Sequence, residues 1–207
     1  CLYGKSGTGK SEFVHHLARR MGRQVVVRRP SDLMSKWHGE TEQNIAAAFA
    51  ETDPATTVLL LDEGDSLVRD RRFAQASWEL AIVNEFLQQL EAYRGLAVVT
   101  TNLFRDLDQA VLRRFTFKVE FLPPLPDQVA ALFQAHLAPL LADPREAEDR
   151  AALGAALRRA GELMPGDFAV VARKAALLRG AWRMEDLVAE LAAEALARGV
   201  EGRTVGF

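Results

Sequence analysis

The stretch from Gly4 to Ser11 constrains this chain more than any other, because it fits the spacing G-x-x-x-x-G-K-[ST] without exception. Glycines let backbone N–H groups turn inward around a phosphate without Cβ clashes, and the helix that follows adds the positive end of its dipole. The residues before the stretch are apolar, as a strand end should be, and those after it have a helical pattern. The sequence therefore predicts a phosphate-binding loop rather than a Gly/Ser-rich turn that binds nothing.

This loop defines the first group of candidate site residues. Lys10 is expected to reach the β- and γ-phosphates of a nucleoside triphosphate, and the hydroxyl of Ser11 is expected to bind Mg²⁺. The expected cofactors are ATP and Mg²⁺. The nucleotide-contacting residues that the loop predicts are Gly4, Lys5, Ser6, Gly7, Thr8, Gly9, Lys10, Ser11 and Glu12.

A second candidate site follows the apolar run 58–61, which leads directly into Asp62 and Glu63. Such a run predicts a buried strand that delivers carboxylates to the edge of a parallel sheet, where open α/β sheets bind ligands. Asp62 is expected to hold Mg²⁺, and Glu63 to accept a proton from the attacking water. Two solvated acids at a strand end would be the simpler interpretation, but the phosphate-binding loop upstream favours the catalytic one.

A further buried strand is predicted at 96–100, and it ends at Thr101 and Asn102. An uncharged amide at that strand tip can orient water or touch the γ-phosphate. Asparagine also turns a chain readily, which is the alternative interpretation. Together with the β-branched run Val25–Val27, expected to fill a buried strand, these patterns predict an α/β fold: a P-loop NTPase parallel sheet flanked by helices.

Three prolines, at positions 123, 124 and 126, mark the best domain boundary. Beyond them the composition shifts to Ala, Leu, Arg and Glu, and apolar residues recur at helical spacing in several segments. The predicted organisation is therefore an α/β nucleotide-binding core at 1–122 and a small all-helical domain at 123–207.

Composition limits the kind of protein further. The chain has 207 residues, 49% hydrophobic content and a formal net charge of −2, which gives no support to sequence-independent binding of nucleic acid. Cys1 is the only cysteine, so a disulfide framework is excluded and a reducing compartment is indicated. No apolar run approaches the roughly 20 residues that span a bilayer. We expect a cytoplasmic protein, and, because the chain begins inside its first strand, a fragment of a longer one.

Taken together, these motifs resemble the AAA ATPases, a branch of the AAA+ superfamily of ring-forming P-loop motors. Gly4–Ser11 is similar to the Walker A loop, and 59–65 to the Walker B strand. The helical segment is similar to the lid of the family. Where the family usually carries Pro-Pro inside Walker A this chain has Lys5-Ser6, and Gly64 replaces the customary Ala or Ile, which we expect to cost only packing.

The resemblance implies roles for several more residues. Asn102 falls on the position called sensor 1, and Arg113 and Arg114 fall on the arginine-finger positions, in a form seen in bacterial members. Gly166 stands where the lid contacts the nucleotide, although the Gly-Ala pair of the family is Gly166-Asp167 here. The segment 35–42 resembles the pore loop of protein-remodelling members such as katanin and spastin, with Lys36, Trp37 and His38 as the substrate-contacting residues.

The function implied is an ATP-hydrolysing motor that remodels, unfolds or disassembles protein substrates as a homo-oligomeric ring, a hexamer by resemblance. One alternative is a DNA-associated AAA+ protein, such as a loader, helicase or transposition helper, in which Arg69, Arg71 and Arg72 would face nucleic acid. The near-neutral charge and the Trp37 motif make nucleic acid the less favoured partner. Another alternative is a scaffold that assembles on ATP without hydrolysing it, which the presence of Glu63 and Asn102 disfavours.

Overall fold

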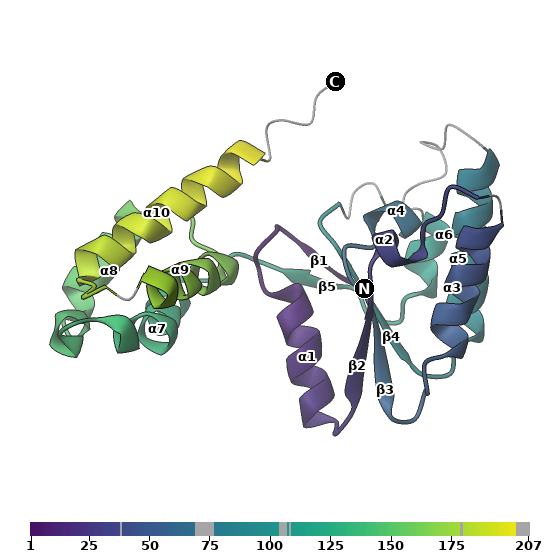
Figure 1. Cartoon of the computed structure of the whole chain (residues 1–207), viewed down its shortest axis with the longest axis horizontal. Helices are drawn as coiled ribbons and strands as arrows, with labels where there is room; N and C mark the ends of the chain where they lie inside the picture. The colour runs from purple at the N-terminus through teal and green to yellow at the C-terminus, as the bar shows by residue number, and fades with distance from the viewer. Residues whose placement is uncertain (38, 69–76, 104–106, 108, 179, 202–207) are drawn as a thin grey trace. The chain divides into compact units, whose positions relative to one another are not determined.

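The computed structural model describes residues 1–37, 39–68, 77–103, 107, 109–178 and 180–201 (Figure 1). The described chain separates into two compact units. The first consists of Cys1–Lys5 and Lys10–Phe121, and the second of Ser6–Gly9 and Leu122–Phe207. Each unit has a hydrophobic core of its own.

The first unit is built on a parallel sheet of five strands in the order β2-β3-β4-β1-β5. The strands are β1 (Leu2–Gly4), β2 (Gln24–Arg28), β3 (Thr57–Leu61), β4 (Leu96–Thr101) and β5 (Val119–Phe121). Every residue of β3 is buried, as its unbroken apolar run predicts for a central strand. The predicted α/β fold with a parallel sheet is confirmed.

Helices cover both faces of this sheet (Figure 1). They are α1 (Lys10–Arg20), α2 (Pro30–Leu33), α3 (Glu40–Ala50), α4 (Asp65–Val68), α5 (Ser77–Ala92) and α6 (Gln109–Arg114). Successive residues of a strand point to opposite faces, so Val58 and Leu60 pack in one cluster with Val14 of α1. Leu59 and Leu61 pack in the other cluster, which includes Phe49 of α3 and Phe86 of α5.

Two strands differ from the sequence-based expectation. Val25–Val27 were expected to fill a buried strand, but β2 lies at the edge of the sheet and these three residues are only half-buried. The alternation of apolar and charged residues at 117–121 predicts a last strand, but the pairing of β5 with β1 runs only from Val119 to Phe121, so the strand is shorter in the structure. The sequence also predicts a short helix at 106–115; of these residues, 106 and 108 lie outside the described residues, and α6 is described from Gln109 to Arg114.

The second unit is helical beyond Leu122, as the sequence predicts. Its helices are α7 (Pro126–His136), α8 (Arg150–Arg159), α9 (Pro165–Leu178) and α10 (Met184–Glu201), with 3₁₀ turns η3 (Ala138–Leu140) and η4 (Pro144–Ala147). The start of α8 is set by Asp149, whose side chain accepts hydrogen bonds from the backbone N–H groups of Ala151 and Ala152. Phe133, Phe168 and Leu187, each from a different helix, are fully buried and form the centre of the core.

Gly64 is packed more tightly than the sequence suggests. A Cβ atom at this position would lie 2.9 Å from Cγ1 of Val99 on β4, closer than real Cβ contacts allow. With valine at position 99, the space at position 64 therefore suits a glycine better than an alanine or isoleucine.

We predict that Gly64→Ala lowers the free energy of unfolding by about 1–3 kcal/mol through overpacking. In a Val99→Ala background, where Cγ1 is absent, the same change should cost at least about 1 kcal/mol less, because the two sites are in contact. Urea unfolding of the four proteins of this double-mutant cycle measures the difference. Strictly additive effects would show that Val99 does not limit the space at Gly64.

Candidate nucleotide-binding site

The predicted loop connects the end of β1 to the start of α1, as a strand–loop–helix unit requires. Gly4 has a φ of 139°, and a Cβ there would lie 2.2 Å from the carbonyl oxygen of Phe121 on β5. Gly7 has a φ of 78°, in the left-handed region that glycine adopts at little cost. The two glycines are needed for the path of the loop.

Lys10 is the central cation of the site. Lys10 is only 8% exposed. Its Nζ donates hydrogen bonds to Gly4 O (2.8 Å), Lys5 O (3.0 Å) and Asn102 Oδ1 (2.7 Å). Burial lowers the pKa of the Lys10 ammonium, and the carboxylates of Asp65, Asp62 and Glu63 act in the opposite direction. The structure thus brings together the loop lysine and the strand-tip amide that the sequence predicted separately.

Ser11 and Asp62 form the second part of the site. The hydroxyl of Ser11 donates a hydrogen bond to Asp62 Oδ1, and Thr100 Oγ1 on β4 donates to the same oxygen at 2.8 Å. A hydroxyl and a carboxylate in contact are hard oxygen donors of the kind that Mg²⁺ prefers. The residues present therefore fit the metal that the sequence predicted for Ser11 and Asp62.

Glu63 follows in an unusual backbone conformation. Its φ is 55°, the one positive φ among the non-glycine residues of the described chain, and its side chain is exposed. A left-handed conformation costs an L-residue roughly 1–2 kcal/mol, and such strain is concentrated at functional sites. Its backbone N–H donates to Thr100 Oγ1 at 2.9 Å, so Thr100 holds the positions of both acids.

Asp65 orients the residue that carries the candidate amide. Its Oδ1 accepts hydrogen bonds from Thr101 Oγ1 and from the backbone N–H of Asn102, the latter at 3.2 Å. Sequence reasoning singled out neither Thr100 nor Asp65 as a site residue. The available signal was the pair of threonines before Asn102, at the tip of a strand that neighbours the acidic one.

The two candidate arginines end α6 and are both exposed. Arg114 contacts α5 through Glu91, with Nη2 and Oε2 3.6 Å apart, and donates to Ala110 O of its own helix at 3.2 Å. Exposed ion pairs of this kind contribute about 0–1 kcal/mol, so the guanidinium is easily released to another partner.

Trp37 is a surface residue, as the pore-loop interpretation requires. It is 68% exposed, and Nζ of Lys36 lies 5.5 Å from the centroid of its ring. Beside them is a hollow of about 310 Å³ whose lining also includes Trp78, itself 48% exposed. The sequence pattern places Trp78 in a helix and gives it no role in the site, so the structure adds a second exposed indole to this surface.

Some of the predicted site residues belong to the second unit or lie outside the residues that the structure describes. Gly166, at the start of α9, donates its backbone N–H to Gly7 O at 2.9 Å, and both residues belong to the second unit. His38, Arg69, Arg71 and Arg72 lie outside the described residues. In the described part of the chain, no helix combines the length and the apolar character that crossing a membrane would require.

The family follows from comparison with known proteins. The model of the family described as "ATPase family associated with various cellular activities (AAA)" matches residues 1–123. The chain therefore belongs to the AAA ATPase family, and the resemblance inferred from the motifs is confirmed. The narrower resemblance of residues 112–115 to bacterial members stays a prediction.

Individual relatives agree with this assignment. Vacuolar protein sorting-associated protein 4 of Dictyostelium discoideum is 31% identical over 142 residues, which cover 66% of this chain and 32% of the relative. Spastin of Naegleria gruberi is 30% identical over 138 residues, covering 62% of this chain and 26% of the relative. A chain in the structure of the E. coli MS115-1 HORMA:CdnC:Trip13 complex aligns with a TM-score of 0.59 and 26% identity, over 73% of this chain and 57% of that one. The matched region is thus a third or less of these two curated relatives.

The role of Thr100 gives a test of the site. Thr100→Val keeps the shape of the side chain but removes the hydroxyl that contacts Asp62 and Glu63. We predict a loss of about 1 kcal/mol in the free energy of unfolding and a roughly tenfold weaker affinity for Mg²⁺-nucleotide, because Asp62 loses an orienting bond.

Thr52→Val is the matched control, since the hydroxyl of the buried Thr52, just after the C-cap of α3, donates to Ala48 O of that helix at 2.7 Å. It should lose similar stability and keep the parental affinity in calorimetry. Equal nucleotide affinities of the two variants would contradict the proposed role of Thr100.

Proposed function

We propose that this chain is the motor region of an ATP-hydrolysing AAA machine that remodels, unfolds or disassembles protein substrates. The observation that carries the proposal is the presence, at the carboxyl edge of the sheet, of two directly hydrogen-bonded pairs, Lys10 with Asn102 and Ser11 with Asp62. Membership of the AAA ATPase family supports it. A nucleotide-binding core at 1–122, a helical lid at 123–207 and a cytoplasmic location are parts of the same proposal.

In this proposal the loop residues bind and the strand-tip residues react. Backbone N–H groups of Gly4–Ser11 and the ammonium of Lys10 hold the phosphates, with Glu12 and Gly166 as further nucleotide contacts. Ser11 and Asp62 hold Mg²⁺, which when bound supplies positive charge to the phosphate oxygens. Glu63 takes the proton of the attacking water, and the amide of Asn102 orients that water.

Hydrolysis is proposed to depend on assembly. Arg113 and Arg114 are exposed. The contacts of Arg114 with the described part of the chain are a weak surface ion pair with Glu91 and a hydrogen bond to Ala110 O, so both arginines are accessible to a second copy of the chain. An arginine supplied in this way increases turnover by about 10³- to 10⁵-fold. We propose a homo-oligomeric ring, a hexamer by analogy with the family, in which one subunit completes the site of the next.

The protein substrate is proposed to contact Lys36, Trp37 and His38. A flat, exposed indole can bind many different polypeptide segments through apolar contact, which suits a motor that pulls without reading a sequence. The exposure of Trp37 supports this role, because a tryptophan used for core packing would be buried.

The assignment of the base predicts the behaviour of Glu63→Gln. The variant should bind ATP with parental affinity, because a glutamine has similar size, and should release phosphate at least about 100-fold more slowly, because general-base catalysis is lost. Glu51→Gln, at an exposed acid that caps α3 and pairs with Arg28, is the control and should keep parental turnover. Phosphate release by Glu63→Gln at the parental rate would show that another group is the base.

The role of Trp37 is tested by separating ATP turnover from work on a substrate. Trp37→Ala should abolish unfolding of a fluorescent protein that carries an unstructured tail, while basal ATP hydrolysis stays within about twofold, since surface changes far from a site have small effects. Trp37→Tyr keeps a flat ring and should restore most of the unfolding. If Trp37→Ala unfolds the substrate at the parental rate, the polypeptide is held elsewhere.

A further inference from the structure

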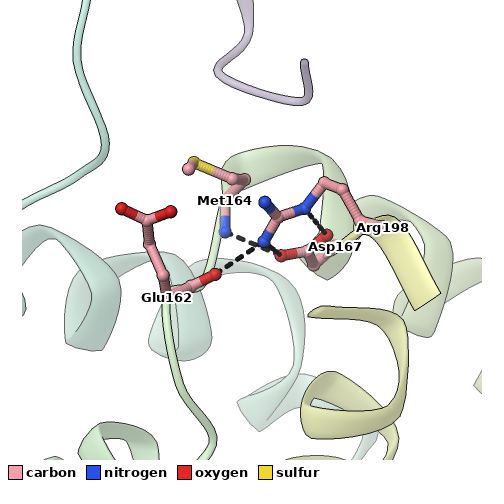
Figure 2. A network of polar contacts seen from close by, with 4 residues as sticks. All are labelled: Glu162, Met164, Asp167 and Arg198. Atoms are coloured by element: carbon pink, nitrogen blue, oxygen red, sulfur yellow. Dashed lines mark hydrogen bonds and ion pairs between the residues drawn. The ribbon is translucent and has the colours of Figure 1, made fainter. Parts of the chain in front are cut away.

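An ion pair between a partly buried guanidinium and a buried carboxylate joins α10 to the start of α9 (Figure 2). The guanidinium of Arg198 on α10 donates from Nε to Asp167 Oδ1 at 3.2 Å and from Nη2 to Asp167 Oδ2 at 3.0 Å. Nη2 also donates to the carbonyl oxygen of Glu162 at 2.6 Å. Asp167 is only 5% exposed, so Arg198 neutralises a carboxylate that is almost completely removed from water.

The same carboxylate shapes the turn before α9. Oδ2 of Asp167 accepts the backbone N–H of Met164 at 2.7 Å, which fixes the turn that runs from Glu162 into the helix (Figure 2). The guanidinium therefore contacts both ends of this turn, at Glu162 and at Asp167. We name residues 162–167 the α9 turn.

The α9 turn lies directly against the phosphate-binding loop segment of the second unit. Gly166 N donates to Gly7 O at 2.9 Å, and a Cβ at Gly166 would lie 3.1 Å from Gly7 Cα. A Cβ at Gly7 would lie 3.3 Å from Met164 Cβ and 3.9 Å from Cδ of Arg198. Arg198, the α9 turn and Gly7 therefore form one continuous set of contacts.

We propose that Arg198 is a positioning residue for the nucleotide: it holds the α9 turn against Gly7 and so keeps the loop in its binding conformation. The inference rests on the proposed nucleotide site and extends it to the end of α10. Coupling between two sites is reciprocal, so bound nucleotide must in turn stabilise the attachment of α10.

General stability is an insufficient reason for this arrangement. A buried ion pair costs desolvation that an apolar pair of similar size avoids, so it contributes little net stability. A bidentate pair instead fixes the relative orientation of the two side chains, because a planar guanidinium fits a carboxylate in few orientations. The helices α9 and α10 are in any case joined by a second ion pair, between Lys174 and Glu190.

The test compares Arg198→Met, which keeps an apolar stem and removes the fork, with Lys174→Met, which breaks the other ion pair between the same two helices. Calorimetry with ADP and with a non-hydrolysable ATP analogue should show about tenfold weaker affinity for Arg198→Met, a typical size for coupling between sites. Lys174→Met should keep the parental affinity. Arg198→Lys keeps the charge and should recover part of the loss.

Two further readouts separate positioning from simple destabilisation. In Arg198→Met the KM for ATP should rise while kcat at saturating ATP stays near the parental value, because the loop can still be ordered by excess ligand. In the parent, nucleotide should slow hydrogen exchange of α10 amides, and this protection should disappear in Arg198→Met. If that variant does not fold, Asp167→Asn, which keeps an acceptor for Met164 N, should show the same weakening of affinity to a smaller extent.

The outcomes distinguish this inference from the function on which it rests. If the folded parent binds no nucleotide, the proposed function is wrong. If the parent binds nucleotide and Arg198→Met or Asp167→Asn binds it equally well, with unchanged exchange of α10, only the positioning role is wrong.

Discussion

The site in the first unit depends on one buried ammonium group. Lys10 is almost completely enclosed, so its charge must be matched by acceptors, and the structure provides three: two loop carbonyls and the amide oxygen of Asn102. Those acceptors come from segments far apart in the sequence. They meet because the sheet order puts β1 next to β4 and β4 next to β3, so the loop, the amide and the acids follow neighbouring strands. The ammonium group of Lys10 is therefore already positioned before a phosphate chain binds. Less conformational entropy is then lost on binding, because folding has already ordered this side chain.

The candidate catalytic residues are in turn held by side chains for which no catalytic role is proposed. Thr100 bonds to Asp62 and to the backbone of Glu63, and Asp65 bonds to Thr101 and to the backbone of Asn102. Arg198 has the corresponding place in the second unit, where it acts on the α9 turn through Asp167. In both units a hydrogen-bonded neighbour fixes the backbone next to a candidate nucleotide contact, which is how a site on loops can be rigid.

The sequence predicted features with a local signature and missed those that depend on contacts across the fold. The loop glycines, the buried run of β3 and the acids after it are each recognisable within a few residues, because backbone conformation and burial demand those residue types. The half-buried state of Val25–Val27 could not be inferred, because it depends on the position of β2 at the edge of the sheet. Thr100 and Asp65 lie 38 and 36 residues from Asp62 and Thr101, the residues whose side chains they contact, and Arg198 lies 31 residues from Asp167. At such separations no local motif shows which residues are in contact; the pair of threonines before Asn102 was the available signal at this strand tip.

The most direct test of this account is calorimetric titration of the folded chain with ADP and with a non-hydrolysable ATP analogue, in the presence and absence of Mg²⁺, for the parent and for Lys10→Ala. The account predicts one nucleotide bound per chain, tighter binding of the triphosphate when Mg²⁺ is present, and an affinity about tenfold to a hundredfold weaker in Lys10→Ala, the range expected for loss of charged hydrogen bonds. No heat of binding by the folded parent, or equal affinity of the two proteins, would contradict it.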